Sequence, residues 1–136
     1  MRITDGGRFL QIALDRAQAN LLSSNVRFSL LDLRRDSLPE DLDLLCLIHV
    51  LDYVRNPLSI RRIRGKVVAS LRPGGYLLVG TFDPADQDFW WSRFMLRGGR
   101  RVVDFFSSHP KLRRLEWKIL PYPGFEFVDA LLQKRE

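Results

Sequence analysis

Residues 71–81 read LRPGGYLLVGT, which combines a turn with the start of a strand. Proline and glycine at positions 73–75 predict the end of a helix, because proline removes a backbone donor and glycine tolerates the conformations that follow a helix. The apolar run from Tyr76 to Thr81 then predicts a strand that is buried on both faces. A helix that turns into such a strand is typical of α/β proteins.

The segment before this turn predicts the rest of a βαβ unit. Asn56 and Pro57 favour a helix start, since asparagine caps free amides and proline suits the first turn. The helix would carry an apolar stripe formed by Ile60, Ile63, Val67 and Leu71. Residues 42–48 are apolar apart from Asp43, which predicts a central parallel strand. Strand, helix and strand at this spacing predict a right-handed crossover.

Further elements are predicted on both sides of this unit. Residues 9–22 predict an amphipathic helix, and residues 26–31 predict a strand that stops at Asp32. Aromatic-rich helices are expected over 86–96 and 100–108. Two closing strands, over 115–119 and 125–132, should pair in antiparallel fashion because a short loop joins them. We therefore expect one α/β three-layer domain over residues 1–136, with a mainly parallel sheet and an antiparallel C-terminal strand pair.

The composition fits a small soluble domain, with 46% hydrophobic and 28% charged residues in a chain of 136. One cysteine, Cys46, offers no disulfide framework, and two histidines far apart offer no metal spacing, so no metal is expected. No apolar run reaches the roughly 18 residues of a membrane span, and the first residues do not resemble a secretory signal. A cytoplasmic location is the expectation.

The net charge of +6 makes a nucleic-acid partner an alternative, because basic domains bind polyphosphate by counterion release. The basic residues form two separate groups, which are Arg61, Arg62, Arg64 and Lys66, and then Arg97, Arg100, Arg101, Lys111, Arg113 and Arg114. Such runs are more often solvated helix faces than binding surfaces. The distribution therefore favours solvated faces over a nucleic-acid surface.

Polar residues recur where the predicted strands end. Asp32 ends one strand, His49 follows the next, and Thr81 and Asp83 follow a third. Open α/β sheets bind ligands at the carboxyl ends of their strands, so these residues are candidates for a site. Each also has a structural interpretation, since Asp32 can close a loop and His49 can start a helix with its ring hydrogen bonds satisfied.

Together with the turn at 71–75, these strand ends resemble the class I S-adenosylmethionine-dependent methyltransferases, which have a Rossmann-like fold. The resemblance implies methyl transfer from S-adenosylmethionine to a small amine or saccharide acceptor. It also implies a role for each matching residue on the cofactor side. Asp5 would bind the ribose hydroxyls, Asp32 and Leu33 the adenine, and Ile48 and His49 the methionine end.

The resemblance implies acceptor-binding residues as well. His49, Asp52 and Tyr53 would orient the acceptor or take its proton, and the substrate-binding residues would be Thr81, Asp83, Trp90 and Trp91. The two tryptophans are also good candidates for core or lid packing. The C-terminal part, with residues 98–103 and 130–132, loosely resembles nodulation-type N-methyltransferases that act on amino-sugar oligosaccharides.

One departure from the family concerns the first strand and its glycine-rich loop, which should lie before Ile3. The resemblance therefore predicts a partial methyltransferase domain truncated at its N-terminus, with a homodimer or a partner chain as a source of the missing strand. A non-catalytic methyltransferase-like partner subunit is the alternative function. A nucleic-acid-binding or RNA-modifying protein is the third.

Overall fold

The computed structural model describes residues 12, 15, 16, 18, 29–51, 54, 56–84, 99–123 and 125–136, except for the side chains of 83, 84 and 125. The chain divides into two compact units, residues 1–36 and 37–136. In the first unit, the described residues 12, 15, 16 and 18 are helical, as predicted for 9–22.

The strand predicted over residues 26–31 is wrong for the residues that the structure describes. Residues 29–32 belong to no strand, and the side chain of Leu30 is 64% exposed. A strand requires a hydrogen-bonded neighbour, and the described residues of this unit include none. At residues 29–31, the alternation of apolar residues was therefore not enough to produce a strand.

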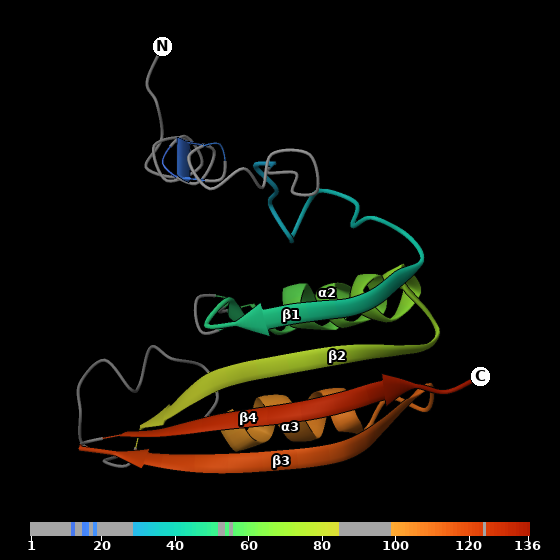
Figure 1. Cartoon of the computed structure of the whole chain (residues 1–136). Helices are drawn as coiled ribbons and strands as arrows, with labels where there is room; N and C mark the ends of the chain where they lie inside the picture. Colours follow the sequence, from blue (N-terminus) through green and yellow to red (C-terminus); the bar gives the residue numbers. More distant parts are fainter. Residues whose placement is uncertain are drawn as a thin grey trace. The chain divides into compact units, whose positions relative to one another are not determined.

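The second unit is built on a four-stranded sheet, shown in Figure 1. Its strands are β1 (Leu42–Ile48), β2 (Leu71–Pro84), β3 (Leu112–Tyr122) and β4 (Phe125–Lys134), in the order β1-β2-β4-β3. β1 and β2 are parallel, whereas β4 is antiparallel to both β2 and β3. The parallel pair with its intervening helix and the antiparallel closing pair are both confirmed.

β2 begins earlier than predicted, because the glycines at 74 and 75 lie within the strand. Gly74 has a φ of 76°, which few other residues adopt. A Cβ at Gly75 would lie 2.7 Å from the carbonyl oxygen of Leu42, so only a glycine allows β1 to come this close. The pairing of β1 with β2 shifts register at the same place, between Leu42 and Leu44.

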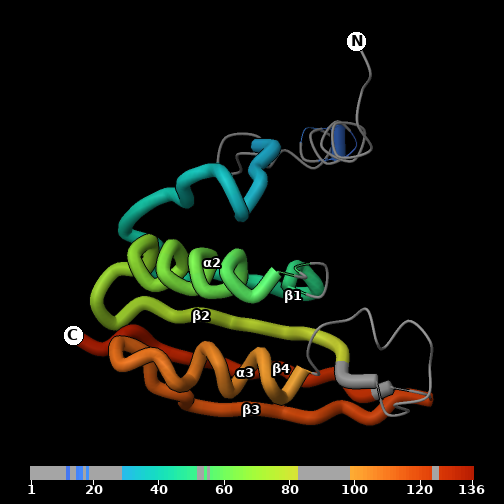
Figure 2. The backbone as a smooth tube through the Cα atoms, turned by 180° about the vertical axis from the view of Figure 1, so that it is seen from behind, coloured from blue at the N-terminus to red at the C-terminus, as the bar shows by residue number. Residues whose placement is uncertain are grey.

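Two helices, α2 (Pro57–Ser70) and α3 (Gly99–Ser107), cover one face of the sheet, as Figures 1 and 2 show. The Asn56 side chain caps α2 by accepting a hydrogen bond of 2.9 Å from the Leu58 amide, as predicted. The predicted apolar stripe of α2 is fully buried. Arg64 of α2 donates a hydrogen bond of 2.6 Å to the Phe105 carbonyl near the end of α3, which ties the two helices together.

The opposite face of the sheet is covered by neither helix. Successive strand residues point to opposite faces, so Leu77, Val79 and Thr81 are buried beneath the helices. Their neighbours on the other face are more exposed, with Leu44 at 53% and Tyr76 at 40%. We call this second surface the open face. Neither α2 nor α3, nor any other helix in the described ranges, is long and apolar enough to cross a membrane.

Candidate active site

His49 lies directly after β1, where the chain turns away from the sheet. Its φ of 56° is a left-handed conformation that costs a non-glycine residue about 1–3 kcal/mol. The His49 amide donates a hydrogen bond of 2.9 Å to the carbonyl of Gly80, which fixes this turn against β2. The strained backbone therefore holds the imidazole at the carboxyl end of β1.

An aromatic cluster surrounds the imidazole. The ring of His49 stacks on Phe82 with centroids 4.0 Å apart, and it meets the edge of Phe127 at 4.6 Å. The two phenylalanine rings contact each other edge to face at 5.7 Å. Phe82 and Phe127 are paired in the β2–β4 register, so the pairing of these strands builds the cluster. We call these three residues the ring cluster.

Asp129 lies beside the ring cluster, on β4 and opposite Gly80 of β2. Its Oδ1 atom is buried and finds no hydrogen-bond donor among the described residues. Burial raises the pKa of this carboxyl, and the nearby charge of His49 lowers it by a smaller amount. A Cβ at residue 80 would overlap Oδ1, so glycine allows the carboxylate to lie against the backbone of β2.

A shallow hollow of about 370 Å³ extends from Asp129 over the open face. Its floor is apolar, with Leu44, Leu78 and Leu131 from three neighbouring strands. Glu116 and Lys118 of β3 lie on its rim and form an ion pair of 3.1 Å with each other. The hollow therefore combines an apolar surface with one carboxylate that is partly removed from water.

Asp32, predicted to bind adenine, lies in the first unit. Its carboxylate accepts hydrogen bonds of 3.0 and 2.9 Å from the Arg34 guanidinium and another of 2.9 Å from the Arg34 amide. These bonds, led by the side-chain contact, lower the pKa of Asp32 to about 2. Leu33 follows in the same turn and is half-buried. A ligand at this position would compete with Arg34 for the carboxylate.

The other predicted site residues lie in different places, some on the open face, some beneath the helices and some outside the described residues. Ile48, 38% exposed, ends β1 on the open face, close to Gly80. Thr81 is 1% exposed and lies on the face beneath the helices, so the structure does not bring it together with His49. Asp5, Asp52, Tyr53, Trp90 and Trp91 lie outside the described residues, as does the side chain of Asp83.

Sequence reasoning did not find Phe82, Phe127 or Asp129. The available signal was the acidic residue at 129 between apolar neighbours in the last strand. A charged residue within an apolar strand needs a partner or a function, so Asp129 could have been selected as a candidate. The two phenylalanines depended on the strand register, which the sequence does not show.

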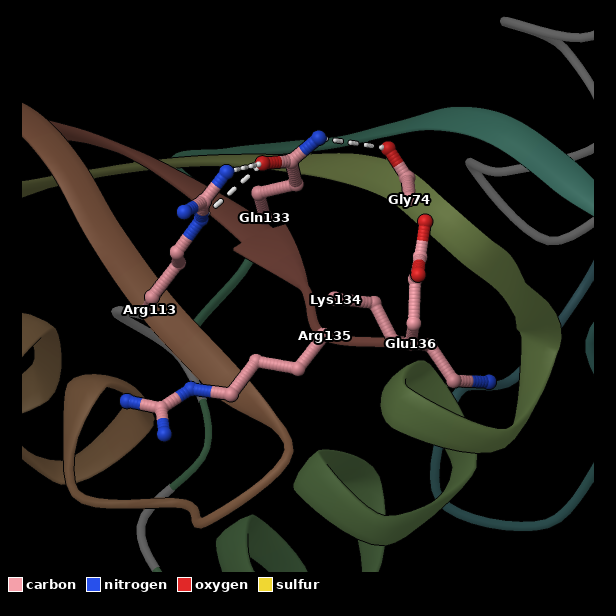
Figure 3. A pocket seen from close by; sticks show the side chains of 6 residues that line it. All are labelled: Gly74, Arg113, Gln133, Lys134, Arg135 and Glu136. Carbon is pink, nitrogen blue, oxygen red and sulfur yellow. Dashed lines mark hydrogen bonds between the residues drawn. The ribbon is translucent and has the colours of Figure 1, made fainter.

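A second hollow, of about 500 Å³, lies at the opposite end of the sheet and is shown in Figure 3. Gln133 lies between Arg113 and Gly74 there, accepting from the guanidinium at 3.0 and 2.5 Å and donating to the Gly74 carbonyl at 3.0 Å. Lys134 donates to the carbonyl of Leu71. These groups bond to one another and connect the strands, so we assign this hollow a structural role.

Several of the described basic residues are engaged with acids or carbonyls. Arg100 pairs with Glu126 at 2.8 Å, and Arg114 pairs with Asp104 at 3.3 Å. Among the described residues, no group of three or more histidine, cysteine, aspartate or glutamate side chains could hold a metal ion.

Comparison with solved structures identifies the fold. The N-methyltransferase NodS from Bradyrhizobium japonicum WM9, in complex with S-adenosyl-L-homocysteine, matches 98% of this chain with a TM-score of 0.77 and 19% identity. An O-methyltransferase from a trans-AT PKS multienzyme of Brevibacillus brevis, also with S-adenosyl-L-homocysteine, matches 98% with a TM-score of 0.71 and 13% identity. The [4+2]-cyclase SpnF matches 93% with a TM-score of 0.72 and 16% identity.

The chain therefore has the fold of the class I S-adenosylmethionine-dependent methyltransferases, as the strand-end pattern predicted. It spans 64% of the NodS chain, 57% of the O-methyltransferase and 62% of SpnF. No protein-family model and no curated protein matches the sequence. Since the three solved structures include a cyclase, the fold by itself does not define the reaction.

Proposed function

We propose that this chain takes part in S-adenosylmethionine-dependent methyl transfer to a small amine or saccharide acceptor. The observation that carries the proposal is the position of His49 on this fold. The imidazole is held by a strained turn at the carboxyl end of a parallel strand, and open α/β sheets bind their ligands there. NodS and the O-methyltransferase, each in complex with S-adenosyl-L-homocysteine, support the choice of cofactor.

The residues at the end of β1 fit the methionine end of the cofactor. Ile48 offers a partly exposed apolar surface, and the ring cluster next to it offers aromatic surface that suits a sulfonium group. When bound, S-adenosylmethionine supplies a methyl group on a good leaving group. Asp5 and Asp32 would hold its ribose and adenine.

The contribution of the protein would be orientation and proton transfer. The residues of this chain would orient an acceptor nitrogen with its lone pair toward the methyl carbon, which the cofactor would release while the electrons of the carbon–sulfur bond stay on sulfur. The acceptor must then release a proton. His49, Asp52 or Tyr53 would receive it, and Asp83, Trp90 and Trp91 remain proposed contacts of the acceptor, whereas Thr81 is buried beneath the helices and is no longer proposed.

The second candidate is a non-catalytic methyltransferase-like subunit. The observation that favours it is the bidentate contact between Asp32 and Arg34, which occupies the carboxylate proposed to bind adenine. A cofactor would have to displace a charge-assisted pair of hydrogen bonds. A chain that no longer binds the cofactor would tolerate this contact.

Calorimetric titration of the chain with S-adenosyl-L-homocysteine distinguishes the two candidates. The methyltransferase candidate predicts micromolar binding of S-adenosyl-L-homocysteine. Asp32→Asn should weaken this binding by about 10- to 100-fold, which corresponds to the loss of one or two hydrogen bonds to a charged group. Arg34→Ala is the matched control, since it frees the carboxylate and should leave binding equal or tighter. A folded chain that does not bind at millimolar ligand refutes the catalytic proposal and supports the second.

A further inference from the structure

The turn that joins α3 to β3 (Figure 2), residues 108–111, depends on a histidine side chain that acts as a hydrogen-bond acceptor. Nδ1 of His109 accepts a hydrogen bond of 3.2 Å from the amide of Lys111, two residues further along the chain. A ring nitrogen accepts only while it carries no proton, so this contact requires the neutral imidazole. The carbonyl of Lys111 accepts a hydrogen bond of 2.8 Å from the Arg135 amide, so the Lys111 backbone is held on both sides.

The charged groups that affect the titration of His109 are Arg64 and Lys111, and both are positive. Arg64 of α2 donates to the Phe105 carbonyl at 2.6 Å and to the Ser108 hydroxyl at 3.1 Å, which brings its guanidinium to the residue before His109. Within the part of the chain that the structure describes, none of Arg64, His109 and Lys111 pairs with a carboxylate. A proton on the imidazole would therefore add a third positive charge with no acid to balance it.

His109 is also half-buried, which adds a cost to its charged form. Burial lowers the pKa of the imidazole, and the charges of Arg64 and Lys111 lower it further. Above the ordinary pKa of 6.5, the ring is neutral whether or not the turn is formed, so the turn has its full stability. As the pH falls below 6.5, a proton binds more readily to the ring in an opened turn, and the formed turn is progressively destabilised.

We propose that the α3–β3 turn is a proton-sensitive switch, in which protonation of His109 breaks its bond to the Lys111 amide and repels Arg64. The turn then opens, and Arg64 loses the Ser108 hydroxyl that the turn holds beside it. Since Arg64 also ties α2 to the end of α3, opening loosens the contact between the two helices. Both helices lie on one face of the sheet, so acidification loosens this layer while the strands stay paired. The inference does not depend on the proposed function.

Amide hydrogen exchange of the full chain, measured by NMR at pH 7.5 and pH 5, tests the switch. After correction for the intrinsic pH dependence of exchange, the protection of the Lys111 amide should fall by about tenfold at pH 5, the value of one hydrogen bond. The amide of Leu77, which lies in a strand paired on both sides, should keep its protection. His109→Asn should keep Lys111 protected at both pH values, because asparagine accepts from the amide two residues on and does not titrate in this range.

Two arginine variants test the part played by repulsion. Arg64→Gln should reduce the fall in Lys111 protection between the two pH values, because it removes a positive charge that opposes the protonated ring. Arg61→Gln is the matched control, since it makes the same change at an exposed position of the same helix, outside the groups that affect His109. Unchanged protection of Lys111 at pH 5, an equal fall in His109→Asn, simultaneous loss of protection at Leu77, or an equal effect of the two arginine variants would each overturn the proposal.

Discussion

Gly80 connects the stability of the sheet with the geometry of the candidate site. A Cβ at this position would overlap Asp129 Oδ1, approach Ile48 Cδ1 to 2.9 Å and approach Phe127 Cζ to 3.3 Å. The ends of the Asp129 and Ile48 side chains must therefore shift in the variant Gly80→Ala, and Phe127 must yield by a few tenths of an ångström. Overpacking costs about 1–3 kcal/mol, and because the displaced atoms are side-chain ends we expect the free energy of unfolding to fall by about 1 kcal/mol.

Gly65→Ala is the matched control, since it is the same chemical change at a position with open space. Gly65 lies in the middle of α2, is exposed, and would place its Cβ within 4 Å of nothing. Alanine in a helix restricts the unfolded chain and favours the helical backbone, so this variant should gain about 0.4–1 kcal/mol. The two glycine-to-alanine changes should thus have opposite signs.

Urea denaturation followed by far-UV circular dichroism gives the free energy of unfolding of both variants, provided that its dependence on urea concentration has the same slope in each. A double variant identifies the cause, because Asp129→Ala removes the closest of the three contacts. The cost of Gly80→Ala should shrink in that background by at least about 0.5 kcal/mol, the lower end of the usual coupling between touching residues. A neutral or stabilising Gly80→Ala, or an undiminished cost in the double variant, would refute the packing described for the open face.

Two further predictions concern carboxyl groups. Arg34→Ala should raise the pKa of Asp32 from about 2 toward 3.8 without reaching it, because the backbone bond from residue 34 survives, and carboxyl NMR titration measures this. Because the pKa of Asp32 is lower in the folded chain, its ionised carboxylate contributes to stability above pH 3.8, and this contribution is lost as the pH falls toward 2. The stability of the variant should therefore depend less on pH in this range. Burial raises the pKa of Asp129 in the folded chain, and the basic groups that face it are His49 and Lys118. Ionisation of Asp129 should therefore lower the stability of the fold as the pH rises through the folded pKa. Asp129→Asn should therefore be more stable than wild type at pH 7 and equal to it near pH 3, and thermal melts that show the reverse order would contradict the assignment.

Local patterns in the sequence were sufficient for the centre of the fold. The cap at Asn56 and the apolar stripe of α2 depend on neighbouring residues, and the structure has them as predicted. The strand over residues 42–48 is also present, but it lies at the edge of the described sheet and not at its centre as expected. The turn at 73–75 was interpreted as a helix stop, but its glycines also serve the close approach of β1. That second role depends on a strand thirty residues away and has no local signal.

The candidate site could be predicted only at the strand ends. His49 was found because it follows an apolar run, whereas the ring cluster depends on the register of β2 with β4. The strand expected over 26–31 is absent at its described residues, 29–31, for a related reason, since apolar alternation does not supply a partner strand. Features that depend on neighbouring residues could therefore be predicted from the sequence, whereas features that depend on the pairing of distant strands could not.

The direction of the last strand explains why the site includes a residue from within a strand. Parallel strands bring their carboxyl ends to one edge of the sheet, and β1 and β2 do so near His49 and Phe82. β4 runs in the opposite direction, so its first residues lie at this same edge, and Asp129 comes to lie beside Gly80. A search restricted to positions after strand ends omits all of β4. In this fold, polar residues near the beginning of the antiparallel strand should be examined together with those at the ends of the parallel strands, because both groups can contact one ligand.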